Sequence, residues 1–459
     1  MERTLAQVAE VVQGRLIGAD APFGAVGTDS RTLERGALFV AIAGERFDGH
    51  RFVADAAAKG AAGAMVTARA DVALAQIEVP DTRTALGRMA KGWRSSFRIP
   101  VIAVTGSSGK TTVKELIAAM LAVGAARRAR AICVTHGNLN NDIGLPLTLM
   151  RLSAGHDAAV VELGANHPGE IAILAEIARP TVGVITNAGA AHLEGFGSLD
   201  GVAKAKGELL DDLPAAGAAV LNADDRYLGE WRARTSAGRV LTFGFAADAD
   251  VTVSGELALD ERGARFALRT PQGIVDVSVP LLGRTNVLNA LAAAAAATAV
   301  GCELADIAAG LAQAAPVRGR MHALAGREGA VVIDDAYNAN PSSARAALDH
   351  LAMLAGRRIF VLGDMLELGD DAAQLHAEVG EYARTRCDAL VAIGPLARHA
   401  AAAFGSGAEV YPDVARAAAD LATCLAEDVT VLVKGSRAMG LERVVAELTA
   451  AQSPEGASC

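Results

Sequence analysis

Residues 101–112 of this chain read Val-Ile-Ala-Val-Thr-Gly-Ser-Ser-Gly-Lys-Thr-Thr, and this stretch decides the fold. The apolar, β-branched run at 101–104 predicts a buried strand, and residues 110–121 predict a helix. Glycines between them allow backbone N–H groups to close around phosphate oxygens, and the helix N-terminus adds a partial positive charge. The sequence therefore predicts a nucleotide-binding α/β unit.

The loop supplies the candidate contacts to a nucleotide, which are Gly106, Ser107, Ser108, Gly109, Lys110, Thr111 and Thr112. Lys110 would bridge the β- and γ-phosphates, and the Thr111 hydroxyl would bind Mg²⁺. Val104 stands where the common phosphate-loop motif has its first glycine. The alternative is a plain Gly/Ser turn before a helix. By itself, the loop indicates only an NTPase.

Strands and helices alternate downstream of this loop. Apolar runs at 158–161, 182–185 and 218–221, separated by helical segments, predict a parallel sheet with right-handed crossovers. Short alternating segments between 250 and 279 predict an antiparallel addition, and an Ala-rich helix at 286–300 follows it.

Both ends of the chain predict further α/β units. After residue 316, a second doubly wound unit is indicated by strands at 331–333, 359–362, 389–393 and 431–433, with helices between them. Before residue 97, a smaller unit has predicted helices at 4–12 and 52–59 and strands at 26–28, 37–42 and 61–67. We therefore predict three domains, at 1–97, 98–314 and 315–459.

The composition limits the class of protein. The 459 residues are 52% hydrophobic and 21% charged, and the formal net charge of −9 argues against general binding to nucleic acid or a membrane surface. We find no signal peptide and no apolar run long enough to span a bilayer. The five scattered cysteines fit a reducing compartment, so we expect a cytoplasmic protein.

Three polar residues downstream of the loop could complete a catalytic centre. Glu162 follows the apolar run at 158–161, where a carboxylate would bind Mg²⁺ beside the loop; a surface glutamate is the alternative. His192 could bind metal or substrate, although a lone histidine is more often structural. Lys206 lies on a predicted helix, where the residues alone favour a lysine exposed to solvent.

Several further segments have distinctive sequences. They are 29–31 (DSR), 44–50 (GERFDGH), 135–144 (THGNLNNDIG), 162–170 (ELGANHPGE), 335–341 (DAYNANP), 362–369 (LGDMLELG) and 434–437 (KGSR). With these segments, the chain resembles the Mur ligase family along essentially its whole length. That family has a shortened phosphate loop without the first glycine, which accounts for Val104.

The resemblance implies a fold, a reaction and cofactors. The implied α/β fold has a small N-terminal substrate domain, a central P-loop-type parallel-sheet ATPase domain and a C-terminal Rossmann-like domain. The implied cofactors are ATP and two Mg²⁺ ions. The implied activity joins D-alanyl-D-alanine to the carboxylate of UDP-N-acetylmuramoyl-tripeptide through an acyl phosphate, as a step of peptidoglycan synthesis, and we expect the enzyme to act as a monomer.

The resemblance also implies residue roles. Lys110, His192 and Lys206 would be catalytic, and Thr111, Glu162, His192 and Lys206 would hold metal, with Lys206 carbamylated. On the nucleotide side it implies the pair Asn286 and Asn289, and two third-domain contacts that form on closure, Arg320 and Asp335. Ser30 and Arg31 would grip the UDP end, and the remaining substrate contacts would be Asn138 and Asn141.

Three alternatives stay open. A sibling enzyme that adds the third residue shares the motif at 29–31 but often carries a DNPR motif, which this sequence lacks. The segments at 338–341 and 363–365 favour the dipeptide-adding member. Folylpolyglutamate synthase is a more distant alternative. From another class, the chain could be an NTP-driven switch, which would hydrolyse ATP without an acyl acceptor and an amine.

Overall fold

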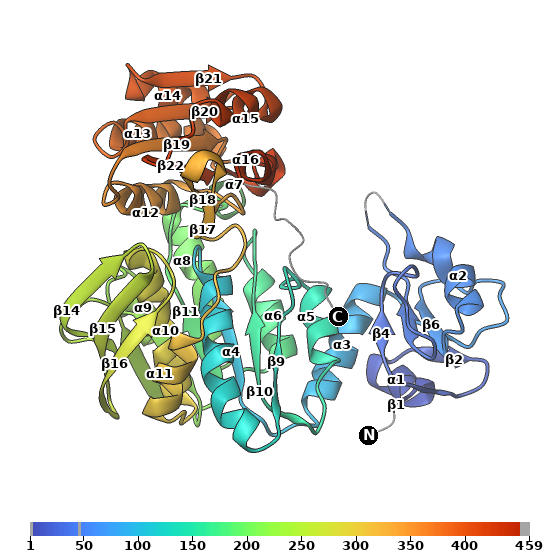
Figure 1. Ribbon diagram of the computed structural model, residues 1–459. Helices are drawn as coiled ribbons and strands as arrows, with labels where there is room; N and C mark the ends of the chain where they lie inside the picture. The colour runs from blue at the N-terminus through green and yellow to red at the C-terminus, as the bar shows by residue number, and fades with distance from the viewer. Residues whose placement is uncertain (1–2, 45–46, 450–459) are drawn as a thin grey trace, which may run out of the picture.

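The computed structural model of the protein describes residues 3–44 and 47–449. Glu45 and Arg46, from the motif at 44–50, therefore lie outside the described residues. The chain forms three α/β units, and Figure 1 shows the N-terminal and C-terminal units attached to different parts of the central one. The predicted three-unit α/β fold is confirmed.

The N-terminal unit is built on a five-stranded sheet with the order β2-β7-β6-β5-β4, in which only the β2–β7 pair is antiparallel. Its strands are β2 (Arg15–Ile17), β4 (Val26–Gly27), β5 (Leu38–Val40), β6 (Gly63–Val66) and β7 (Gln76–Glu78), and β1 (Arg3–Thr4) pairs separately with β3 (Pro22–Phe23). Its helices are α1 (Leu5–Val12), α2 (Val53–Ala58) and α3 (Thr82–Arg94). The sequence did not predict β1, β2, β3, β7 or α3.

Helix α3 joins the N-terminal unit to the central unit. Leu86 and Met89 of α3 pack in one buried cluster with Leu145, Leu149 and Leu174 of the central unit. Burying apolar surface of this kind contributes roughly 1.5–3 kcal/mol for each large side chain. The position of the N-terminal unit therefore depends on a shared hydrophobic core.

The central unit contains a six-stranded sheet with the order β13-β12-β11-β8-β10-β9, and every pair in it is parallel. The strands are β8 (Val101–Thr105), β9 (Ala131–Val134), β10 (His156–Glu162), β11 (Val182–Ile185), β12 (Ala218–Asn222) and β13 (Arg239–Phe243). The helices are α4 (Lys110–Arg127), α5 (Gly144–Leu149), α6 (Glu170–Ala178), α7 (Leu193–Phe196), α8 (Leu199–Gly207), α9 (Leu228–Arg234), α10 (Arg284–Ala299) and α11 (Leu304–Ala312).

Strand β8 is buried on both faces, as the continuous apolar run predicts. Val101 and Ala103 face the cluster that contains α3, α5 and α6. Ile102 and Val104 face the cluster that contains α4, α10 and α11. The helices therefore cover both sides of the sheet and leave only its ends open.

The predicted antiparallel addition is confirmed. It consists of β14 (Thr252–Asp260), β15 (Gly263–Thr270) and β16 (Gly273–Val279), and its apolar side chains share the cluster with α10 and α11.

The C-terminal unit is a second six-stranded sheet with the order β17-β18-β22-β19-β20-β21, parallel except for the edge pair β17–β18. The strands are β17 (His322–Ala325), β18 (Val331–Asp335), β19 (Arg357–Gly363), β20 (Ala389–Ile393), β21 (Ala408–Tyr411) and β22 (Val429–Lys434). Helices α12 (Pro341–Leu351), α13 (Ala372–Ala383) and α14 (Ala397–Phe404) cover one face, and α15 (Val414–Ala422) and α16 (Glu442–Leu448) the other.

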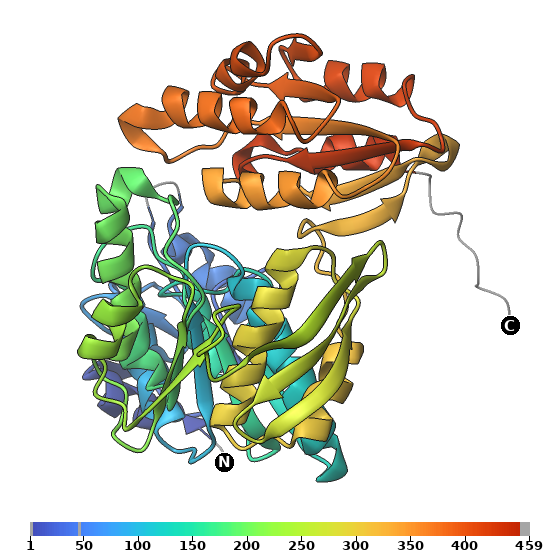
Figure 2. The same ribbon diagram turned by 90° about the vertical axis from the view of Figure 1, so that its left-hand side faces the viewer.

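The carboxyl ends of β8, β10 and β11 meet at one edge of the central sheet, because these strands are parallel neighbours. Figure 2 shows the C-terminal unit lying across this end of the central unit. In open α/β sheets, ligands bind at this edge. We therefore expect a ligand site in the space between these two units.

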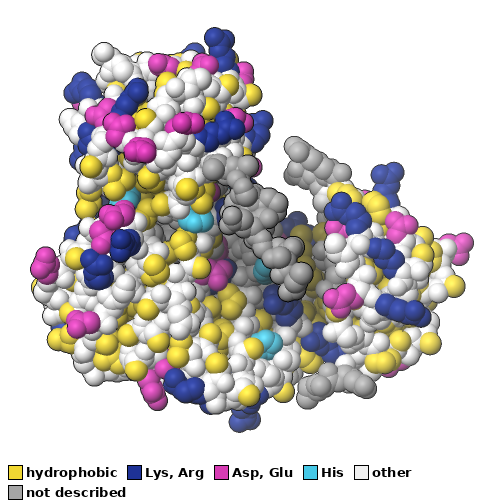
Figure 3. Space-filling model, viewed as in Figure 1, with side chains coloured by type: hydrophobic (Ala, Val, Ile, Leu, Met, Phe, Trp, Pro, Cys, Tyr) yellow, Lys and Arg dark blue, Asp and Glu magenta, His cyan; other side chains and the backbone are white. Residues whose placement is uncertain are grey.

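The surface carries both signs of charge. Figure 3 shows acidic and basic side chains interspersed over the visible face. In the described part of the chain, every helix is too short or too polar to cross a membrane.

Candidate active site

The phosphate loop needs glycine at two positions. Gly106 and Gly109 have φ values of 144° and 83°, in the region that disfavours other residues. A Cβ at Gly106 would collide with Thr186 Oγ1, and one at Gly109 would collide with Asn289 Oδ1. Backbone N–H groups can therefore line the loop at close range.

The segment after β11 holds this loop in shape. Asn187 Oδ1 accepts a 3.0 Å hydrogen bond from Ser108 N, and the Asn187 carbonyl accepts one of 3.0 Å from Ser107 N. Thr186 Oγ1 donates to the Ser108 carbonyl over 2.6 Å. Sequence reasoning missed Thr186 and Asn187, although both lie directly after a predicted strand at the ligand edge.

Lys110 begins α4 and turns back over the loop, where its Nζ donates to the Gly106 carbonyl over 2.7 Å. Desolvation lowers the pKa of Lys110, and the nearby carboxylate of Glu162 opposes that shift. An anionic phosphate in the loop would favour the charged form of this buried amine.

Thr111 and Glu162 form the best candidate for a metal position. Thr111 Oγ1 donates to Glu162 Oε2 over 2.9 Å, and Asn140 Nδ2 donates to Glu162 Oε1 over 2.8 Å. Glu162 is buried at the end of β10. A hydroxyl and a carboxylate are hard oxygen ligands that fit Mg²⁺, which usually takes one or two carboxylates and completes its shell with phosphates and water. Sequence reasoning missed Asn140.

Within the described ranges, three or more His, Cys, Asp or Glu side chains do not gather into a metal-binding group. The candidate position therefore rests on Thr111 and Glu162, with phosphate oxygens needed to complete it.

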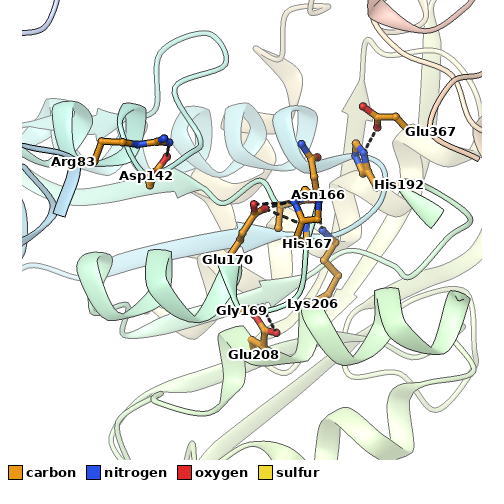
Figure 4. A network of polar contacts seen from close by, with 11 residues as sticks. Arg83, Asp142, Asn166, His167, Gly169, Glu170, His192, Lys206, Glu208 and Glu367 are labelled. Atoms are coloured by element: carbon orange, nitrogen blue, oxygen red, sulfur yellow. Dashed lines mark hydrogen bonds and ion pairs between the residues drawn. The ribbon is translucent and has the colours of Figure 1, made fainter. Parts of the chain in front are cut away.

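Lys206 is buried, so the reading of a lysine exposed to solvent is wrong. Only 1% of its surface is exposed, because α8 directs the side chain inward. Its Nζ lies 3.4 Å from the Ala165 carbonyl and 5.0 Å from the centre of the Phe196 ring. Figure 4 shows the side chain pointing toward the loop of Asn166 and His167.

Burial lowers the pKa of Lys206 to about 7, and the charge of Lys110 adds to that effect. The carboxylates of Glu170 and Glu208 oppose the shift. At neutral pH, a large share of the Lys206 amine is therefore uncharged.

His192 connects the central and C-terminal units. Its Nδ1 contacts a carboxylate oxygen of Glu367, which follows β19 in the C-terminal unit (Figure 4). Both residues have left-handed backbone conformations, with φ values of 55° and 61°. Burial lowers the pKa of His192, and the charge of Glu367 opposes this. Apart from the motif at 362–369, nothing in the sequence indicates a role for Glu367.

A cavity of about 580 Å³ borders several of these residues, although Thr111 and Lys206 are not among the described residues that line it. It is lined by the phosphate loop with Lys110, by Glu162, Glu170 and His192, by Asn140, Asn141 and Asn166, and by Arg83, Arg320 and Tyr337, among others. Arg83 of α3 reaches across from the N-terminal unit and donates to Asp142 over 2.8 Å. Arg83 was also missed, because the sequence did not predict α3.

The four residues predicted to contact the substrate differ in their position relative to this cavity. Asn141 lines the cavity, and its Oδ1 accepts from Gly144 N over 2.8 Å at the start of α5. Asn138 is exposed and does not line the cavity. Ser30 is buried in the N-terminal unit, whereas Arg31 is exposed and pairs with Asp29 over 2.7 Å. Neither Ser30 nor Arg31 lines the cavity among the residues that the structure describes.

A second cavity, of about 200 Å³, opens from the same loop toward α10 and α12. Asn289 Nδ2 donates to Asn286 Oδ1 over 3.0 Å within α10. Arg320 Nη2 lies 3.4 Å from Thr111 Oγ1. Asp335 pairs with the buried Lys434 over 2.5 Å. These four predicted nucleotide contacts therefore line one space, together with Ser107, Ser108, Gly109 and Thr112.

The C-terminal unit touches the phosphate loop directly through a residue that sequence reasoning missed. Asn340 Nδ2 donates to Ser108 Oγ over 3.3 Å. Its Oδ1 accepts from Ser343 N, and together with the Ser343 hydroxyl this caps α12.

The sequence matches known proteins over nearly its whole length. Residues 104–297 match the Mur ligase middle domain, 319–437 match the Mur ligase glutamate ligase domain, and 22–94 match the Mur ligase family catalytic domain. A protein of Escherichia coli (strain K12), UDP-N-acetylmuramoyl-tripeptide–D-alanyl-D-alanine ligase, is 45% identical over 97% of this chain and 98% of its own length. This chain belongs to the Mur ligase family.

Solved Mur ligase structures share the fold. A crystal structure of MurF from Acinetobacter baumannii has a TM-score of 0.90 at 37% identity and covers 98% of this chain and 99% of its own. MurF ligase from Thermotoga maritima in complex with ADP has a TM-score of 0.81 at 28% identity, covering 92% and 96%. The family that the motifs indicated is therefore confirmed for this Mur ligase.

Proposed function

We propose that this Mur ligase joins D-alanyl-D-alanine to the terminal carboxylate of UDP-N-acetylmuramoyl-tripeptide and cleaves ATP to ADP and phosphate. The observation that carries the proposal is the 45% identity to the Escherichia coli enzyme of that name, which extends over 97% of the chain. The product is a UDP-linked pentapeptide, a precursor of peptidoglycan.

ATP would lie with its phosphates in the loop 106–112 and its nucleoside in the second cavity. A MurF relative that is 28% identical has been crystallised with ADP, which supports the use of this nucleotide. Lys110 would neutralise the β- and γ-phosphates, and Thr111 with Glu162 would hold Mg²⁺. Bound there, Mg²⁺ would offset the negative charge that builds up on the phosphates during transfer.

The reaction has two steps. A carboxylate oxygen of the tripeptide attacks the γ-phosphorus, the bond to the bridging oxygen breaks, and ADP leaves with an acyl phosphate formed. The neutral amine of the dipeptide then attacks the acyl carbon, loses a proton, and expels phosphate that contains the former carboxylate oxygen. Lys110 stabilises the charge that develops in the first step.

Lys206 and His192 would act on the same side of the phosphate loop. The lowered pKa of Lys206 leaves an uncharged amine that can take up carbon dioxide and release a proton. The resulting carbamate carries one negative charge shared by two oxygens, which suit a hard cation. We propose that carbamylated Lys206 and His192 together bind a second Mg²⁺.

The tripeptide would occupy the larger cavity. Arg83 and Asn141 border that cavity and supply a charge and an amide for an anionic peptide. The UDP end would extend toward Ser30 and Arg31 in the N-terminal unit. Asn138 lies on the same loop as Asn141 and would reach the substrate only if that loop moves.

We retain the domain limits 1–97, 98–314 and 315–459. They are supported by chain segments that lie between α3 and β8 and between α11 and β17. Because the reaction consumes ATP and a UDP-linked substrate, we propose that the enzyme acts in the cytoplasm, and as a monomer.

The two enzyme alternatives have weaker support. The similar structures of a diaminopimelate-adding ligase and of folylpolyglutamate synthase are 21% and 19% identical, a level that indicates a common fold only.

A matrix of phosphate-release assays tests the proposal. ATP is combined with UDP-N-acetylmuramoyl-tripeptide or the corresponding dipeptide nucleotide, and each with D-alanyl-D-alanine, diaminopimelate or glutamate. Release should require ATP, the tripeptide nucleotide and D-alanyl-D-alanine together. Equal release with ATP alone would indicate a switch, and release with diaminopimelate and the dipeptide nucleotide would indicate the sibling ligase.

A further inference from the structure

One buried histidine has no hydrogen-bond partner within residues 3–44 and 47–449. His350 lies near the end of α12 with only 5% of its surface exposed. Neither of its ring nitrogens has a partner among the described residues. Burial lowers the pKa of His350, which favours the neutral ring with one N–H donor and one nitrogen acceptor. Unpaired groups of this kind are rare in folded proteins, so they point to a missing partner.

His350 faces the second cavity, which begins at the phosphate loop. The length of helix α10 indicates how far His350 lies from the phosphate loop. Asn289 lies against Gly109 of the loop, and Gly283, at the start of α10, lies against the His350 ring. Six residues of helix span roughly 9 Å, so the histidine lies beyond the phosphates by about the reach of a nucleoside.

The space next to His350 suits a flat ring. Gly283 has a φ of 82°, which favours glycine, and a Cβ there would be in ordinary van der Waals contact with the His350 ring at 3.5 Å. The cavity wall also includes Leu282, Ala346 and Ala347. Ala346 and Ala347 lie near His350 on α12, and Leu282 adjoins Gly283. That end of an otherwise largely polar cavity therefore has an apolar wall of the kind that small organic ligands occupy.

Several other buried polar side chains in this cavity already have partners. Asn289 donates to Asn286, and Asn286 Nδ2 donates to the Leu282 carbonyl over 2.8 Å. Asp335 pairs with Lys434. Among the described residues that line this cavity, His350 has fully buried side-chain polar atoms without a partner, so it can gain a new hydrogen bond when the cavity fills.

We propose that His350 makes a hydrogen bond to the base of the bound adenine nucleotide and so contributes to nucleotide selection. This inference rests on the proposed function, because it takes ATP as the ligand. A purine edge presents donors and acceptors side by side, and a neutral imidazole can match either. Because His350 belongs to the C-terminal unit and Asn286 and Asn289 to the central unit, the base would connect the two.

Binding to the full-length protein tests this with two probes, ADP and inorganic tripolyphosphate, in titration calorimetry. His350→Leu should weaken ADP binding by about 3- to 10-fold, the effect of one lost hydrogen bond, and leave tripolyphosphate binding unchanged. His399→Leu, on α14 and outside the cavity, is the matched control and should change neither affinity. Unchanged ADP affinity in His350→Leu, or an equal loss for both probes, would overturn the proposal.

The wild-type protein provides a second test that does not depend on the folding of a variant. Two ADP analogues are compared with ADP, one lacking the exocyclic amine and one lacking N7. At least one should bind about 3- to 10-fold more weakly than ADP. If both bind as tightly as ADP, His350 does not contact the base. These measurements use no peptide substrate, so an absence of ligated product would overturn the proposed function without deciding the role of His350.

Discussion

Thr111 Oγ1 donates a 2.9 Å hydrogen bond to Glu162 Oε2, joining the first turn of α4 to the end of β10. The two residues are far apart in sequence, but β8, which precedes α4, and β10 are neighbouring parallel strands. A hydroxyl and a carboxylate thus meet beside the phosphate loop. This contact defines where Mg²⁺ and the phosphates would lie.

Glu162→Gln should raise the Mg²⁺ concentration needed for half-maximal activity by about 10- to 100-fold. Glutamine can still accept from Thr111, so the variant removes mainly charge. The measurement is a Mg²⁺ titration of ligase activity. Glu176→Gln, which alters an exposed carboxylate on α6 paired with Lys91, is the control. An unchanged Mg²⁺ requirement in Glu162→Gln would show that Mg²⁺ is bound elsewhere.

Lys110→Ala should lower kcat by at least about 100-fold, as removal of one group that stabilises transition-state charge commonly does. ADP binding should weaken as well, because the amine lies over the loop. Steady-state kinetics and calorimetry measure the two effects. Lys91→Ala, on the surface of α3, should behave like the wild type. Near-normal turnover of the Lys110 variant would show that the phosphates of ATP do not bind in this loop.

Much of the fold follows from local sequence patterns. β11 and β20 were predicted with the bounds that the structure has, because each is a short apolar run in the interior of a parallel sheet. Helix α3 was not predicted, although Asp81 caps its N-terminus. Its apolar side chains pack against the central unit, and this contact cannot be inferred from the local sequence. Strands β2 and β7 are short pieces that depend on their partners across the sheet.

The candidate site was predictable only in part. Lys110, Thr111 and Glu162 follow from a strand, a glycine loop and a strand end. The burial of Lys206 could not be inferred from its helix alone, since it depends on Phe196 and Ala165. Glu367 and Asn340 reach the site from the C-terminal unit. The spacing of motifs in the sequence of the central unit does not indicate that these two residues contact it.

Lys206→Ala should lose most of its activity, about 100-fold or more, because a ligand for the second Mg²⁺ would be missing. Lys204→Ala is the matched control on the same helix, and its exposed side chain should tolerate the change. Added acetate or formate should partly restore the Lys206 variant by supplying carboxylate oxygens. Full activity of Lys206→Ala without any addition would remove this lysine from the mechanism.

The buried amine of Lys206 also predicts a pH-dependent stability. Its pKa is about 7 in the folded protein and ordinarily 10.5, so between these values the unfolded chain binds more protons. The free energy of unfolding therefore rises with pH over this window. The destabilisation caused by burying the Lys206 amine is fully present below about pH 7. In buffer free of carbon dioxide, Lys206→Met should raise Tm by several degrees at about pH 6.5, and the gain should shrink as pH approaches 10.5. A gain that does not depend on pH would contradict the lowered pKa, and Lys204→Met should show no such trend.

The most direct test of the ligase assignment labels the terminal carboxylate of UDP-N-acetylmuramoyl-tripeptide with ¹⁸O and supplies ATP and D-alanyl-D-alanine. Mass spectrometry then measures both products of the wild-type enzyme. We predict a UDP-linked pentapeptide and an inorganic phosphate that has gained one ¹⁸O from the carboxylate. Unlabelled phosphate, or phosphate released without the joined peptide, would contradict the account.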